Sequence, residues 1–146
     1  MDITLNTILL SSILATIVMT TFSYLMSTTF NELYKEPVLL TYFLNKFNLK
    51  ISFQLKNILA WLLHFVIGYI FVLSYHFLWT YTILNLSVLN GILFGAVSGL
   101  LGILGWVSIF EYTQYQPKID FNGYFIQLFF AHVIFGLVAY IVYSQI

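Results

Sequence analysis

Long apolar runs alternate with short polar connections along this chain of 146 residues. A helix that crosses the hydrocarbon core of a bilayer needs about 20 mainly apolar residues. Four segments meet this length, and every Lys, Asp and Glu lies outside them: residues 3–26, 57–79, 86–110 and 121–143. The pattern therefore predicts an all-α membrane protein, in which one domain over residues 1–146 contains four transmembrane helices.

The connection between the first two apolar segments is much longer than the other two. It contains an apolar stretch from Val38 to Phe47 that Pro37 precedes, with lysines at its margins. Pro is favoured in the first turn of a helix, and such a stretch is typical of a helix that lies on the membrane surface. We therefore expect a short interfacial helix over about residues 37–47. We expect the neighbouring Glu36 to be a solvated carboxylate at that surface or a partner of Lys35.

The composition limits the classes of function. Hydrophobic residues make up 61% of the chain and charged residues 7%, whereas about a quarter of the residues of a soluble domain are charged. The formal net charge is zero, so the basic patch that nucleic acids require is missing. The absence of cysteine removes disulfides and thiolate metal sites. The expected partners are the lipid bilayer and other membrane-protein subunits or a second copy of the chain, without nucleic acid.

The lysines predict an orientation. All five lie in the first and third connections: Lys35, Lys46, Lys50, Lys56 and Lys118. Positive charge marks the cytoplasmic side of a membrane protein. We therefore expect a multi-pass protein of the bacterial inner membrane with both termini on the non-cytoplasmic side.

Two histidines lie within apolar segments and share a motif. His64 and Gly68 stand in the same His-x-x-x-Gly relation as His132 and Gly136. A spacing of four places each histidine and its glycine on one face of a helix. Because the two motifs occupy segments that cross the membrane in the same direction, they predict a parallel internal repeat of two helix pairs.

Small residues line the other two segments. The first carries a stripe of hydroxyls at Ser12, Thr16, Thr20, Ser23 and Ser27. The third carries glycines at Gly91, Gly95, Gly99, Gly102 and Gly105, beside Ser98. Small faces allow helices to pack closely in membranes. We expect helix contacts at these glycines, other than Gly105, and at Gly68 and Gly136.

These features also carry a resemblance. The "ATIVMT" of the first segment, the two His-x-x-x-Gly motifs and the glycine-rich third segment resemble an uncharacterised family of small bacterial four-helix integral membrane proteins. The resemblance implies the four-helix fold and no reaction.

The histidines allow several interpretations. In the structural one, each ring hydrogen-bonds to a hydroxyl on a neighbouring helix, with Thr16, Thr20 and Ser98 as the candidates. In the functional ones, His64 and His132 ligate haem from facing helices or belong to a relay for protons or substrate. No acidic residue lies in any predicted span, which argues against a strongly coupled proton pump.

The leading functional hypothesis is assembly, because packing faces outnumber chemical groups. No hydrolase, nucleotide-binding or metal motif occurs in the sequence, so we expect a non-enzymatic protein without a metal, acting as a homo-oligomer or as a small subunit of a larger membrane complex. The alternative is a carrier or binder of a small neutral or lipophilic molecule, or of haem, in an intramembrane pocket lined by His64, His132, Thr16, Thr20 and Ser98. A closed bundle would favour assembly, and a cavity at mid-membrane depth would favour binding.

Overall fold

A computed structural model describes residues 3–47, 50–114 and 117–146, and within them the chain forms five helices and no strands. These are α1 (Ile3–Phe30), α2 (Glu36–Lys46), α3 (Phe53–Tyr81), α4 (Val88–Thr113) and α5 (Phe121–Gln145). All except α2 are long and apolar enough to cross a membrane. The predictions of an all-helical chain and of four long apolar helices are therefore confirmed, although α1, α3 and α5 extend a few residues beyond the expected ranges.

Local sequence explains where the helices begin. The hydroxyl of Ser52 accepts a hydrogen bond from the backbone N–H of Leu55 at 3.2 Å, and that of Ser87 accepts one from Asn90 at 3.3 Å. Both serines are N-caps, which satisfy backbone donors that a helix start leaves without partners. Helix α4 therefore begins just after Ser87, later than hydropathy alone predicts.

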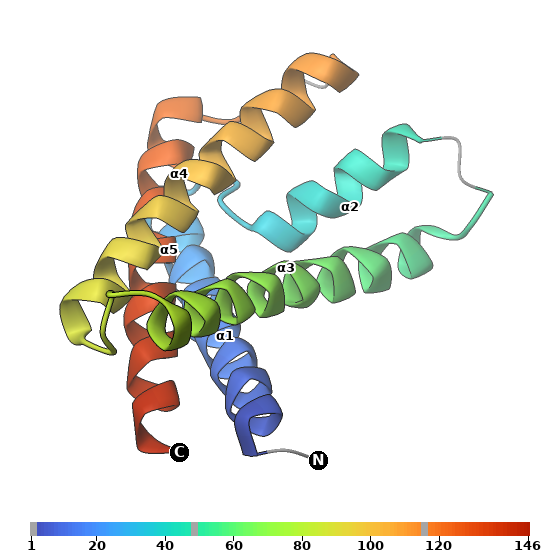
Figure 1. Cartoon of the computed structure of the whole chain (residues 1–146). Helices are drawn as coiled ribbons and strands as arrows, with labels where there is room; N and C mark the ends of the chain where they lie inside the picture. The colour runs from blue at the N-terminus through green and yellow to red at the C-terminus, as the bar shows by residue number, and fades with distance from the viewer. Residues whose placement is uncertain (1–2, 48–49, 115–116) are drawn as a thin grey trace.

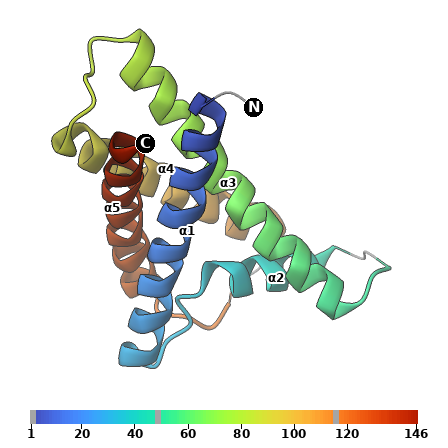
Figure 2. The same cartoon turned by 90° about the horizontal axis from the view of Figure 1, so that it is seen from below.

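The long helices are packed unevenly. Helix α5 packs against α1 and α4, while α3 packs against α1 and α2. From the short connection between them, α3 and α4 diverge like the arms of a V, and α2 lies within this V (Figure 1). Both termini lie at one end of the bundle and α2 lies at the other (Figure 2).

Helix α2 is part of the core. Its Leu39 and Leu40 are buried and pack in one cluster with Trp106 of α4 and with Tyr124 and Leu128 of α5. The helix is also attached to the start of α3 by two side-chain hydrogen bonds, from Lys56 to Asn45 and from Thr41 to Asn57. A helix forms where one was expected, and it packs into the V with one side.

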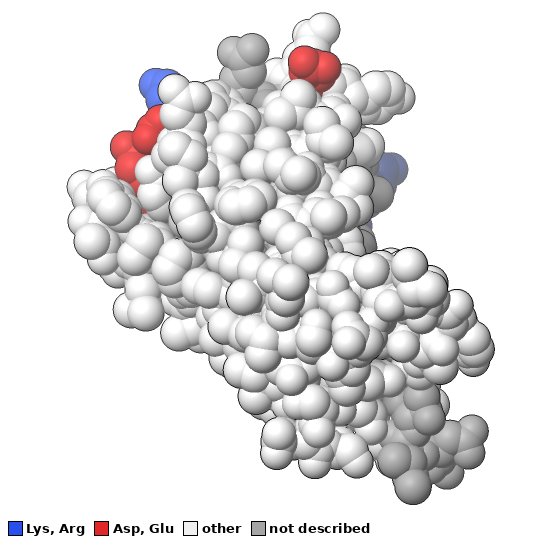
Figure 3. Space-filling model, turned by 60° about the vertical axis from the view of Figure 1, so that its left-hand side comes forward, with Lys and Arg blue, Asp and Glu red and all other residues white. Residues whose placement is uncertain are grey.

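On the face that Figure 3 shows, the charged side chains of the described residues gather in one region. In the view of Figure 3, Lys, Asp and Glu lie towards one end of the molecule, and the remaining described surface is uncharged. This distribution agrees with the four long apolar helices of a multi-pass membrane protein.

Candidate functional site

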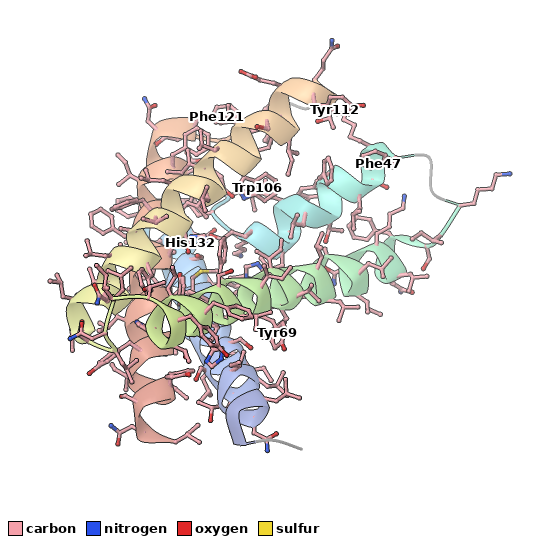
Figure 4. All side chains as sticks on the ribbon, viewed as in Figure 1. Phe47, Tyr69, Trp106, Tyr112, Phe121 and His132 are labelled. Carbon is pink, nitrogen blue, oxygen red and sulfur yellow. The ribbon has the colours of Figure 1, made fainter. Side chains whose placement is uncertain are left out.

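The space between the arms of the V holds a cavity of about 210 Å³. All five helices contribute to its walls. The lining residues are Met19 of α1; Glu36 and Leu40 of α2; His64, Ile67, Gly68 and Phe71 of α3; Leu101, Gly102, Gly105, Trp106 and Ile109 of α4; and Leu128, His132 and Phe135 of α5. Trp106 and His132 approach this region from α4 and α5 (Figure 4). The walls are mostly apolar, with one carboxyl group and two imidazole rings among them.

The carboxyl group belongs to Glu36, which is only 3% exposed. Its Oε1 accepts a hydrogen bond from the hydroxyl of Ser23 at 2.8 Å, and that hydroxyl accepts one from the amide Nε2 of Gln127 at 2.7 Å. Its Oε2 is buried and has no hydrogen-bond partner among the described residues. Buried polar atoms in proteins are nearly always paired, so this oxygen would be satisfied by a further hydrogen-bond donor.

The expectation that Glu36 is a solvated carboxylate is wrong. It lies in the first turn of α2, and this end of the helix is inserted among α1, α4 and α5 rather than left at the surface. The alternative pairing with Lys35 is not the observed arrangement, since the Nζ of Lys35 lies 4.9 Å from the ring centroid of Tyr24. Although no predicted span contains an acidic residue, α2 places one inside the bundle.

Burial also changes the acidity of Glu36. It raises the pKa of this carboxyl to about 7, because loss of water disfavours the charged form. The hydrogen bond from Ser23, together with the nearby backbone and the amide of Gln127, opposes part of this rise in pKa. The carboxyl group therefore gains and loses its proton near neutral pH.

The ring of His64 is held by α1. Its Nε2 lies 2.9 Å from the hydroxyl of Thr20, which itself donates to the backbone carbonyl of Thr16 at 2.7 Å. A hydroxyl has one proton to donate, so the Nε2 of His64 is the donor in this pair. In the neutral ring, Nδ1 is then left as an acceptor.

The ring of His132 is held by its own helix. Its Nδ1 lies 2.9 Å from the backbone carbonyl of Leu128, which only accepts, so Nδ1 carries a proton. In the neutral ring, Nε2 is left as an acceptor on the side of Gly102. Glu36 in its charged form, His64 and His132 thus each carry a hydrogen-bond acceptor, and all three residues line the cavity.

The other predicted site residues lie outside the cavity wall. Thr20 is one of the hydroxyls expected beside a histidine, but Thr16 packs against Gly68, and its hydroxyl has no partner among the described residues. Ser98 lies 2.6 Å from the hydroxyl of Tyr75. The structure therefore replaces the predicted lining of Thr16, Thr20 and Ser98 with Glu36 and apolar side chains.

Most of the predicted packing glycines lie at helix contacts. A Cβ on Gly91 would lie 3.0 Å from the carbonyl of Gly136, and one on Gly99 would lie 3.2 Å from the Cα of Phe129. Gly95 is closer still to α5, at the carbonyl of His132, and Gly68 meets α1 at Thr16. Gly102 differs, because it faces the ring of His132 and lines the cavity.

Sequence reasoning missed the polar group around Glu36. Gln127 and Tyr124 are buried on α5, and Gln127 Oε1 and the hydroxyl of Tyr124 have no hydrogen-bond partner among the described residues. Gln127 is a polar residue inside an apolar segment, which was a signal that it has a partner in the bundle. No pattern in the sequence joins it to Glu36.

Within the described residues, no three His, Cys, Asp or Glu side chains are grouped closely enough to hold a metal ion. No protein-family model, curated protein or solved structure matches the chain. The resemblance to a family of small bacterial membrane proteins stays a prediction.

Proposed function

We propose that the protein binds a small lipophilic molecule that carries a hydrogen-bond donor, with the donor directed at Glu36. The observation that carries this proposal is the buried Oε2 of Glu36, which lacks a partner among the described residues and belongs to a side chain lining a mostly apolar cavity. An N–H or O–H group would satisfy it, and the apolar walls would accept a hydrocarbon body. The acceptor nitrogens of His64 and His132 favour the same class of ligand.

The volume of the cavity limits the size of the ligand. Pockets for drug-sized molecules measure about 300–1,000 Å³, whereas this one measures about 210 Å³. A short aliphatic or monocyclic alcohol or amine matches it better than a larger molecule. Haem has a macrocycle that exceeds this space, so the volume argues against ligation by His64 and His132.

Assembly is the other function expected from the sequence. The small helix faces that supported this expectation make contacts within the chain itself. The glycines Gly91, Gly95 and Gly99 contact α5, and hydroxyls of α1 contact His64 and Glu36. These faces are therefore covered without a second subunit. We retain a homo-oligomer or a subunit of a larger complex as the second candidate. Size-exclusion chromatography with light scattering in mild detergent tests it, because the method measures the mass of the assembly.

We further infer that the protein resides in a bacterial inner membrane with the α2 end in the cytoplasm. Lys35 directly precedes α2, Lys46 is its last residue, and Lys56 near the start of α3 donates to Asn45 of α2. Positive charge favours the cytoplasmic side. Tags at both termini should be accessible from outside intact cells stripped of their outer membrane, and a protected C-terminus would contradict this orientation.

The proposed binding is testable through Trp106, which lines the cavity. With Trp61 and Trp79 replaced by Phe, the remaining tryptophan reports quenching by a short alcohol that carries a terminal bromine. We expect saturable quenching, beyond the linear quenching that probe dissolved in the micelle causes. A bromoalkane of the same length, which has no donor, should bind more weakly.

Two acidic residues provide the matched variants. At a pH above about 8, where the Glu36 carboxyl is ionised, Glu36→Leu should weaken binding of the bromoalcohol about tenfold or more, since a hydrogen bond to a charged group is worth about 1.5–3 kcal/mol. Glu111→Leu alters an exposed residue of α4 outside the cavity and should bind as the parent does. Quenching that never saturates, or that both variants reduce equally, would contradict the proposal.

A further inference from the structure

The cavity opens to the exterior at one particular place. Most of its lining residues are buried or half-buried, but Ile67 on α3 is 37% exposed and Leu101 on α4 is 53% exposed. Gly105, one turn after Leu101, is exposed as well. Residues that line a cavity and also reach the surface mark its mouth, and these three lie on the two arms of the V (Figure 1).

This mouth lies at the depth of the hydrocarbon core. Ile67 is 14 residues from the start of α3, and Leu101 is 13 from the start of α4, which corresponds to about 20 Å along each helix. Both positions are near the middle of their helices. The neighbouring exposed residues Ile70 and Leu104 are also apolar, so lipid rather than water would meet the mouth.

Glycine keeps this wall thin. A Cβ placed on Gly105 would meet nothing within 4 Å, and one placed on Gly102 would first meet the ring of His132 at 3.2 Å. Small residues at these positions leave a passage between lipid and the histidine. A side chain larger than Ala at Gly105 would project into free space at the mouth.

The opposite route, from the aqueous side, is closed by α2. Leu40 lines the cavity and is buried against α4 and α5, and Lys56 and Asn57 bind α2 to α3. A ligand arriving from water at this end would have to displace a helix with a buried apolar side. The lateral mouth requires no such movement.

We infer that the ligand enters and leaves sideways, from the bilayer, through a portal formed by Ile67, Leu101 and Gly105. This inference rests on the proposed binding function and deepens it, because it identifies the ligand as a bilayer-dissolved amphiphile rather than a water-borne solute. Its hydrocarbon part passes between α3 and α4, and its N–H or O–H group reaches Glu36.

The portal is tested by the kinetics of binding. The protein with Trp106 as its only tryptophan is reconstituted in liposomes and mixed with liposomes preloaded with the bromoalcohol, and quenching is followed in time. Gly105→Phe should slow both association and dissociation about tenfold, as a modest added barrier does, so that each rate changes more than their ratio. Leu104→Phe, at a neighbouring residue 62% exposed and outside the cavity wall, is the matched control and should keep the parental rates.

A second variant acts from the other arm of the V. Ile67→Phe should also slow both rates, which protects the test against a folding defect of Gly105→Phe. Saturable quenching with parental rates in both variants would overturn the portal and leave the binding function intact. Absence of saturable quenching in the parent protein would overturn the binding function and the portal together.

Discussion

Helix α4 carries glycines along most of its length, yet its two halves use them differently. In the first half, a Cβ on Gly95 would lie 3.0 Å from the Cα of Val133 and 3.1 Å from that of Gly136, so α4 and α5 are in backbone contact. In the second half, a Cβ on Gly105 would meet nothing within 4 Å. The same residue type closes the bundle at one end and leaves a cavity at the other.

The difference depends on what lies opposite each glycine. Gly91 and Gly95 face Gly136, which is also small, so the two backbones approach each other. Gly102 faces the imidazole of His132, and this ring lines a cavity whose other walls include residues of α2 and α3. A glycine repeat therefore indicates that close approach is allowed, and the partner decides whether it occurs.

The largest expected effect tests this contrast directly. Gly95→Leu should prevent folding, because its side chain would collide with the backbone of His132 and Val133. Overpacking against side chains usually costs about 1–3 kcal/mol. The cost here should be larger, because the backbone moves less easily than a side chain. Gly105→Leu inserts the same side chain into open space and should fold. Size-exclusion profiles and thermal unfolding in detergent distinguish them, and similar behaviour of the two variants would break the comparison.

The next effect concerns Glu36, which lines the cavity, and it depends on pH. Burial raises the pKa of Glu36 from 4.5 to about 7, so between these values the folded protein holds a proton that the unfolded chain has released. Stability therefore falls as pH rises through this window, by about 3 kcal/mol in total. Glu36→Gln should remove this loss and be more stable than the parent above pH 7.

The measurement is unfolding in mixed micelles at several pH values. The difference between parent and Glu36→Gln isolates this carboxyl from His64, His132 and Tyr124, which are present in both proteins. A constant difference across the window would show that Glu36 does not change protonation on unfolding.

A smaller effect concerns the hydrogen bond from His64 to Thr20 of α1. Thr20→Val removes the hydroxyl that accepts from His64 and leaves the ring nitrogen without that partner, which should cost about 1–2 kcal/mol. Thr21→Val removes an exposed hydroxyl that bonds only to the Ile17 carbonyl of its own helix and should have little effect. Unfolding in mixed micelles provides the test, and equal losses would indicate that the bond from His64 contributes nothing to stability.

The smallest effect sharpens the contrast at the open end. Gly105→Ala adds one methyl group where no atom lies within 4 Å and replaces the poorer helix former, so stability should rise by up to about 1 kcal/mol. Gly99→Ala, with Phe129 3.2 Å away, should not gain stability. A loss at Gly105 would mean that the wall is closed there.

Local sequence determined most of the helical framework. The four apolar runs are long enough to cross a bilayer, and Ser52, Ser87 and Pro37 set where α3, α4 and α2 begin. The spacing of four also fixed which residues share a helix face, so His64 and His132 were recognised beside their glycines. These features depend on residues close in the chain, and the chain itself therefore specifies them.

Only the tertiary structure decided the position of Glu36 and what lies opposite each glycine. A glutamate before Pro37, at the start of a short apolar helix, has the same sequence signature whether that helix lies on the membrane or enters the bundle. Its burial required the divergence of α3 from α4 and the insertion of α2 between them (Figure 1). Likewise, Gly99 and Gly102 differ only in what α5 places opposite them. Such contacts join residues far apart in sequence, and no local pattern records them.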